Sequence, residues 1–224
     1  MSEATAIQVR NVIDNIPSEI VIENSTGLFT QKVDGNLIKT LDKFLFLSGA
    51  RISEVVTLQR PCERDKLFNS GNQLTMNYAK FGGEEIAVFT ITTLKRTDHI
   101  QRSVALPLNT KYERWTKDII KEWGKSNPFN IHRQLAWKAN RIVFKGLNYK
   151  VTPRLKPAIY KPISNHGLRH VRIRELIMDY NFNVLEVQRY VGWTASSIGV
   201  NTLVDTYFNL VWRDYIGKLL VEIN

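Results

Sequence analysis

The chain has 224 residues, of which 43% are hydrophobic and 10% are aromatic, and it carries a formal net charge of +10. This length and composition allow a sizeable buried core and exclude an intrinsically disordered chain. The N-terminus lacks the features of a signal peptide, no apolar run is long enough to cross a membrane, and the lone Cys62 can form no internal disulfide, so we expect a cytoplasmic (nucleoid) or nuclear protein without a membrane partner.

The first 35 residues show no strong hydrophobic periodicity. They contain a proline and two glycines, so residues 1–35 are expected to form an irregular lead-in segment with one short helix. From Asn36 apolar residues recur at helical spacing, and Gly49 can end that helix. A second helix is expected to begin near Ala50.

A three-stranded antiparallel sheet is expected next. Alternation over residues 74–78, a turn at 81–84 and a β-branched stretch at 86–93 together predict a hairpin. A second turn at 95–98 leads into a third short strand that ends at Pro107.

Two helical patterns follow the sheet. They cover residues 112–123, closed by Gly124, and residues 131–144. Residues 146–163 contain three prolines and are expected to form a loop.

The C-terminal part is also helical in pattern. Ser164 can cap a helix that runs to about Tyr180, and Asn183 can cap another that ends at Gly192. The predicted fold class is therefore mainly α with a small three-stranded antiparallel sheet, an α+β protein.

The surplus positive charge is concentrated in one segment. Between Glu122 and Glu175 there is no acidic residue, and 12 of the 52 residues are basic. The rest of the chain is nearly neutral, with 19 basic and 21 acidic residues. A basic segment interleaved with aromatic residues is typical of a surface that neutralises DNA phosphates, although a solvated basic face has the same composition. We expect double-stranded DNA as the partner, bound by Arg133, Lys138, Arg141, Lys150, Arg154, Lys156 and Lys161.

Four short motifs carry side chains suited to phosphate chemistry. They are A-R-I-S-E at residues 50–54, T-L-K-R-T at 93–97, N-H-G-L-R-H at 165–170, and V-G-W followed by V-D-T-Y-F at 204–208. Each has an ordinary explanation when taken alone, such as an exposed helix-end arginine, a solvated lysine or a core tyrosine. In the third motif a histidine and an arginine three positions apart share one side of a helix near its start, where free backbone N–H groups favour an anion.

The third motif also contains an H-x-x-x-H pair, His166 and His170. Such a pair can bind zinc from one helix face, but zincin chemistry requires a glutamate where Gly167 stands. No metal site is therefore expected.

In their order along the chain, these motifs resemble those of the tyrosine recombinase family, the phage-integrase-like enzymes, whose pattern is Arg, Lys, His-x-x-Arg, His or Trp, then Tyr. The resemblance covers residues 36–221 and is most specific in the runs L-F-L-S-G-A-R-I-S-E-V-V-T-L and H-G-L-R-H. It implies the catalytic-domain fold of this family over residues 36–224. The core-binding domain that usually precedes it is expected to be absent.

The resemblance implies a set of catalytic residues, which are Arg51, Lys95, His166, Arg169, Trp193 and the nucleophile Tyr207. The arginines would clamp the non-bridging phosphate oxygens, His166 and Trp193 would donate hydrogen bonds to them, and Lys95 would protonate the departing 5′-hydroxyl. A 3′-phosphotyrosyl link preserves the phosphodiester energy, so neither a metal, nor ATP, nor another cofactor is expected. Glu54 and His170 are expected to orient or pack rather than to catalyse.

Some alternatives stay open. Trp193 and Tyr207 are 14 positions apart, more than is usual in the family, which leaves Tyr215 as a competing nucleophile. The enzyme is expected to act as a homo-oligomer, a tetramer, on DNA, and a monomer when alone is the other option. Competing functions are type IB topoisomerase-like relaxation of DNA and a catalytically inactive DNA-binding module of the same fold.

Overall fold

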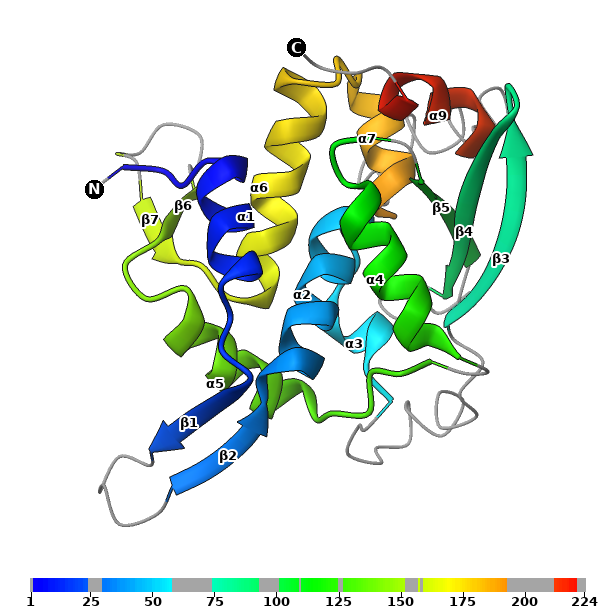
Figure 1. The fold of residues 1–224 in the computed structure, drawn as a ribbon. Coiled ribbons are helices and arrows are strands. Elements are labelled where there is room, and N and C mark those ends of the chain that lie inside the picture. Colours follow the sequence, from blue (N-terminus) through cyan, green and yellow to red (C-terminus); the bar gives the residue numbers. More distant parts are fainter. Residues whose placement is uncertain are drawn as a thin grey trace.

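The computed structural model describes residues 2–23, 30–57, 74–92, 101–108, 110–124, 127–151, 157, 159–192 and 212–220. Within these ranges the chain is an α+β protein, with helices packed around a central helix and small antiparallel sheets at the periphery (Figure 1). The predicted α+β class is confirmed.

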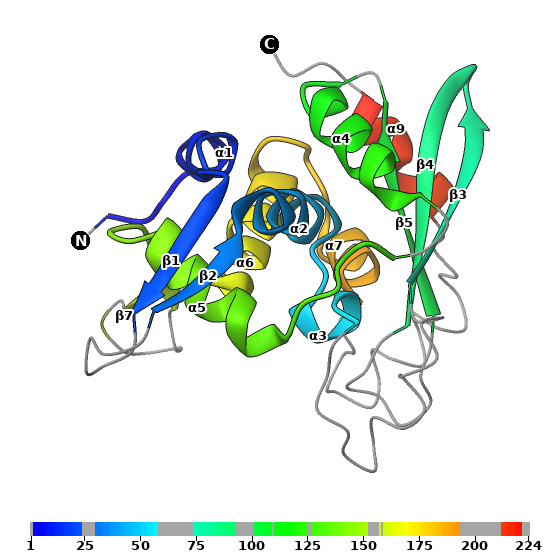
Figure 2. The same cartoon turned by 60° about the horizontal axis from the view of Figure 1, so that its bottom comes forward.

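The central helix is α2 (Gly35–Ser48), and every residue of its second half is buried. The carboxylate of Asp34 caps it by accepting hydrogen bonds from the first free N–H groups. Gly49 ends the helix in the left-handed conformation, with φ of 59°, as the sequence predicted. A helix that is buried on all sides must be surrounded by other elements, and α2 packs against α6 (Asn165–Met178) and α4 (Glu113–Trp123) (Figures 1 and 2).

The second predicted helix is shorter than expected. It begins after Arg51 and comprises one turn, α3 (Ile52–Val55), because Val56 already has extended backbone with ψ of 143°. Val55 and Val56 are buried.

The predicted three-stranded sheet is confirmed. It consists of β3 (Leu74–Phe81), β4 (Glu84–Thr92) and β5 (Gln101–Pro107) in the order β3-β4-β5, with both pairs antiparallel. Gly82 and Gly83 both have positive φ, which allows the two-residue turn between β3 and β4. The C-terminal helix α9 (Trp212–Leu220) packs against β5 (Figure 1).

The remaining helices lie close to their predicted positions. They are α4, α5 (Arg133–Val143), α6 and α7 (Val184–Val191). The Asn183 side chain caps α7 in a reciprocal capping box with Glu186, and Gly192 ends the helix. Ser164 precedes α6 as predicted, but its side chain makes no capping hydrogen bond.

Two predictions of irregular structure were wrong. Residues 1–35 contain the expected short helix, α1 (Ala6–Asp14), but also a hairpin of β1 (Glu19–Glu23) and β2 (Thr30–Asp34). The predicted loop at 146–163 contains a second hairpin. Its strands are β6 (Asn148–Val151) and β7 (Ile159–Pro162).

Both hairpins are stabilised by tertiary contacts that a local pattern does not reveal. In β1, Ile20 and Ile22 alternate with charged or exposed residues and are buried in the common core. In the second hairpin Pro162 stands at the end of a two-stranded ribbon, where a missing N–H donor is tolerated. The backbone N–H of Ala4 also donates to the Asn148 carbonyl at 2.8 Å, which joins the N-terminal segment to β6.

Candidate functional site

Arg51 lies at the N-terminal end of α3 and is held there by Glu54. The Arg51 backbone N–H donates to Glu54 Oε2 at 3.0 Å, and its Nη1 donates to Glu54 Oε1 at 2.9 Å. The Glu54 side chain is fully buried, whereas 20% of the Arg51 side chain is exposed. Glu54 thus orients Arg51 from inside the protein, as expected from the sequence, and leaves part of the Arg51 side chain exposed.

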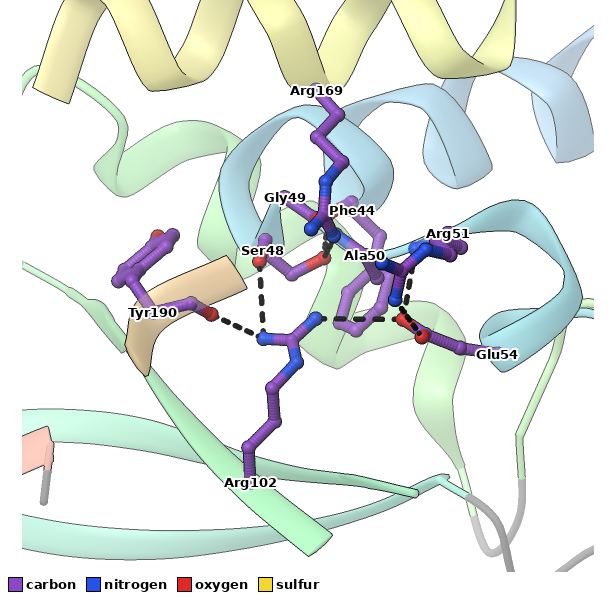
Figure 3. A network of polar contacts seen from close by, with 9 residues as sticks. All are labelled: Phe44, Ser48, Gly49, Ala50, Arg51, Glu54, Arg102, Arg169 and Tyr190. Atoms are coloured by element: carbon purple, nitrogen blue, oxygen red, sulfur yellow. Dashed lines mark hydrogen bonds and ion pairs between the residues drawn. The ribbon is translucent and has the colours of Figure 1, made fainter. Parts of the chain in front are cut away.

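Arg169 reaches the same place from α6. Its side chain is 2% exposed, and Nη1 donates to the carbonyl of Gly49 at 2.5 Å (Figure 3). Gly49 belongs to the turn that links α2 to Arg51. Although 120 positions separate Gly49 from Arg169, the two arginines of the sequence motifs meet at one turn.

That turn is held by local hydrogen bonds. The Ser48 hydroxyl donates to the Phe44 carbonyl at 2.6 Å and accepts from the Ala50 N–H at 3.2 Å. The Ser48 hydroxyl therefore helps to end α2, and the Gly49 carbonyl that follows it points towards α6 (Figure 3).

A third arginine, which the sequence analysis did not identify, completes the cluster. Arg102 on β5 is 5% exposed, and its Nη1 donates to the carbonyl of Tyr190 in the last turn of α7. The same Nη1 lies 3.5 Å from the Ser48 carbonyl, and Nη2 lies 3.6 Å from Glu54 Oε2. A signal did exist in the sequence, because Arg102 shares its side of the strand with Val104 and Leu106, which are both buried.

The cluster carries more positive than negative charge. In the part of the chain that the structure describes, the guanidinium groups of Arg51 and Arg102 contact the carboxylate of Glu54, and that of Arg169 lies nearby against Gly49 (Figure 3). Burial, together with the nearby Arg102 and Arg51, lowers the pKa of Arg169 to about 9, while Glu54 opposes them. Burial likewise lowers the pKa of Arg102. Such a cluster favours the binding of an anion.

His166 is an exposed residue in the first turn of α6, one turn before His170. The Nε2 atoms of the two rings are 3.1 Å apart. The His170 ring stacks on Tyr149, with centroids 4.7 Å apart and an interplanar angle of 25°. Gly167 permits this packing, since a Cβ there would come within 3.0 Å of the Tyr149 ring. Burial lowers the pKa of His170, and Arg169 adds to this effect.

The basic residues of the predicted DNA surface lie on α5 and on the second hairpin. All of those within the described ranges are exposed, namely Arg133, Lys138, Arg141, Lys150 and Lys161. Trp137, which is 48% exposed, lies under the Arg141 guanidinium at 5.6 Å. This helix therefore presents cations and an aromatic ring to solvent together.

Hydrogen bonds connect α5 and the segment before it to α2, α3 and α6. In the segment before α5, the Asn127 side chain donates to the Val55 carbonyl of α3 at 2.6 Å. From within α5, Asn140 donates to Asp42 of α2 at 2.6 Å and to Asn165, the first residue of α6, at 3.2 Å. Asp42 and Asn140 are fully buried, and burial raises the pKa of Asp42 to about 8. The helix that carries part of the predicted DNA surface is thus bonded through its buried side to α2 and to the start of α6.

Tyr215, the competing nucleophile, is buried at 1% exposure. Its hydroxyl donates to the Ser103 carbonyl at 2.9 Å, and burial raises its pKa. Both features oppose formation of a phenolate that could attack a phosphate, so Tyr215 is a packing residue in this conformation. The other predicted residues, Lys95, Trp193, Tyr207, Arg154 and Lys156, lie outside the described residues.

Within the described ranges, no three His, Cys, Asp or Glu side chains gather as a metal centre would require, and none of the helices is long and apolar enough to cross a bilayer. Comparison with protein-family models, with curated proteins and with solved structures finds no match to this chain.

Proposed function

We propose that the chain is a site-specific DNA recombinase or integrase of the tyrosine recombinase type, which cleaves and rejoins DNA strands through a 3′-phosphotyrosyl intermediate. The observation that carries this proposal is the meeting of Arg51 and Arg169 at the Gly49 turn. These are the two residues to which the motif resemblance assigns the phosphate clamp.

The charge of the cluster suits this role. Three guanidinium groups and one carboxylate leave two positive charges beside a partly exposed Arg51 side chain. A phosphodiester carries one negative charge, and its pentacovalent transition state places more charge on the non-bridging oxygens, so donors fixed beforehand stabilise the transition state. Guanidinium groups fit this geometry because their donors form a rigid fork.

In the proposed reaction the phenol of Tyr207 releases its proton to solvent, its oxygen attacks phosphorus, and the bond to the 5′ oxygen breaks. Lys95 gives a proton to the departing 5′-hydroxyl, and the 3′-phosphate stays on the tyrosine. A 5′-hydroxyl from another strand then attacks the phosphotyrosine and restores the phosphodiester. His166 and Trp193 donate hydrogen bonds to the phosphate. The roles of Lys95, Trp193 and Tyr207 rest on the resemblance alone.

The DNA surface in this proposal is the exposed basic side of α5 together with the second hairpin. Its support is the hydrogen bonding of the α5 region to α3 and to the start of α6. If this surface binds the phosphates of the DNA backbone, one scissile phosphate would lie near the arginine cluster. Recombination between two sites requires several subunits, so we include a homotetramer on DNA in the proposal.

The test uses a library of genomic fragments, from the genome that encodes the chain, cloned in supercoiled plasmids. We expect protein-linked DNA on denaturing gels with the wild type and none with Tyr207→Phe, while filter binding of DNA is equal for the two. Tyr215→Phe is the matched control and is expected to keep the adduct, because its hydroxyl is engaged with Ser103.

Each other outcome identifies a different function. An adduct that persists in Tyr207→Phe would move the nucleophile to another tyrosine. Ladders of relaxed plasmid without exchanged products would indicate a type IB topoisomerase. DNA binding without any adduct in the wild type would indicate an inactive DNA-binding module.

A further inference from the structure

Arg102 joins the ends of four elements at the centre of the described structure. It extends from β5 to the last residue of α2, to the last turn of α7 and to the buried carboxylate of α3 (Figure 3). Tyr190 strengthens the same junction, because its hydroxyl donates to the Leu47 carbonyl while its own carbonyl accepts from Arg102. One guanidinium thus lies where two helices end side by side.

The position suits a cation. The last carbonyls of a helix have no partner within the helix, and the helix dipole places partial negative charge there. At α2 and α7 this negative charge comes from two helices at once, and Glu54 adds a full charge at 3.6 Å. These interactions compensate a guanidinium that is almost completely withdrawn from water.

The groups that Arg102 contacts are also the groups that orient the motif arginines. Ser48 lies immediately before Gly49, whose carbonyl accepts from Arg169. Glu54 is the carboxylate that binds both the backbone and the guanidinium of Arg51. Arg102 therefore acts on both sides of the turn between α2 and α3 without reaching the solvent-exposed side.

We propose that Arg102 is a positioning residue, which sets the relative placement of the Arg51 and Arg169 guanidinium groups through Glu54 and the Ser48–Gly49 turn. The inference rests on the proposed function, since it assigns these two arginines to one phosphate. A displacement of about 1 Å in such a pair lowers the rate of a phosphoryl transfer by about 100-fold. Arg102 itself contacts no DNA in this proposal.

The test compares Arg102→Lys with Arg174→Lys. Lysine keeps the charge but lacks the forked set of N–H donors of a guanidinium, so it cannot contact Glu54 and the carbonyls at the two helix ends at the same time. Arg174 is an arginine on α6 that pairs with Glu3 at 2.6 Å, and 53% of its side chain is exposed, so it does not contact the groups that Arg102 holds. Arg102→Gln is the second variant if the lysine variant does not fold.

Two quantities are measured, with wild type and variants at the same concentration of folded protein. The first is single-turnover cleavage of the DNA fragment that is recovered as an adduct with the wild type. We expect Arg102→Lys to be slower by at least tenfold with a DNA Kd within twofold of wild type, and Arg174→Lys to cleave at the wild-type rate. In ¹H–¹⁵N NMR without DNA we expect the side-chain Nε–H signals of Arg51 and Arg169 to shift in Arg102→Lys only.

The outcomes separate this inference from the proposed function. Wild-type cleavage by Arg102→Lys, or unmoved NMR signals of both arginines, would overturn the positioning role. A wild type that forms no adduct would overturn the proposed function, and the NMR comparison would still decide whether Arg102 sets the geometry.

Discussion

Replacement of Glu54 by glutamine tests whether the arginine cluster is held by one buried carboxylate. Glu54→Gln keeps the shape of the side chain and one acceptor for the Arg51 N–H, but it removes the negative charge that faces Arg51 at 2.9 Å and Arg102 at 3.6 Å. Arg51 and Arg102 then lose the carboxylate partner that they share. We expect the variant to fold with reduced stability.

The size of the effect follows from the burial of the pair. Removal of one partner from a buried ion pair costs about 3–5 kcal/mol. Because 20% of the Arg51 side chain is exposed, water compensates part of its charge, and we expect a loss of about 3 kcal/mol in the free energy of unfolding. This is a large share of the roughly 5–15 kcal/mol that stabilises a typical domain.

Urea unfolding followed by circular dichroism measures the loss. The matched control is Glu113→Gln, which breaks an ion pair between side chains that are 62% exposed for Lys117 and 43% exposed for Glu113, and which should cost less than about 1 kcal/mol. A Glu54→Gln variant that loses no more stability than this control would refute the assignment of Glu54 as the carboxylate that holds the cluster.

Three further predictions concern other parts of the chain. Because burial raises the pKa of Asp42 to about 8, the folded state holds its proton more tightly than the unfolded chain, so this group's contribution to stability is full below about pH 4 and is lost as the pH rises towards 8. Thermal unfolding at pH 5 and pH 8 should show Asp42→Asn gaining stability relative to wild type by about 3–4 kcal/mol over that interval, and equal pH dependence would contradict the burial argument. Replacement of both Lys138 and Arg141 by alanine should reduce the slope of log K against log salt for DNA binding by about 2, whereas Lys121→Ala on α4 should leave it unchanged; a slope retained in the double variant would remove α5 from the DNA surface. Asn183→Ala should cost about 1 kcal/mol in urea unfolding, because it removes the side-chain cap of α7, and an unchanged midpoint would show that the cap contributes nothing.

The sequence by itself determined the elements whose signals are local. The turn glycines at 82–83 and the alternating strands beside them defined the three-stranded sheet. Gly49 and Gly192 marked two helix ends, and Asn183 one helix start, because each signal acts within a single turn of backbone. The sequence also singled out Arg51 and Arg169 as a pair, through a resemblance of motifs and not through any local physical signal.

The tertiary structure decided the features that depend on distant contacts. The β1–β2 and β6–β7 hairpins are short ribbons that gain their stability from the common core, so their own sequences resemble loops. Only the tertiary structure shows that Arg102 belongs to the site, since its partners include the backbone carbonyls of Ser48 and Tyr190. A carbonyl has the same chemistry in every residue, so no sequence motif can mark it as an acceptor, and only the packing of α2, α7 and β5 determines which arginine it binds.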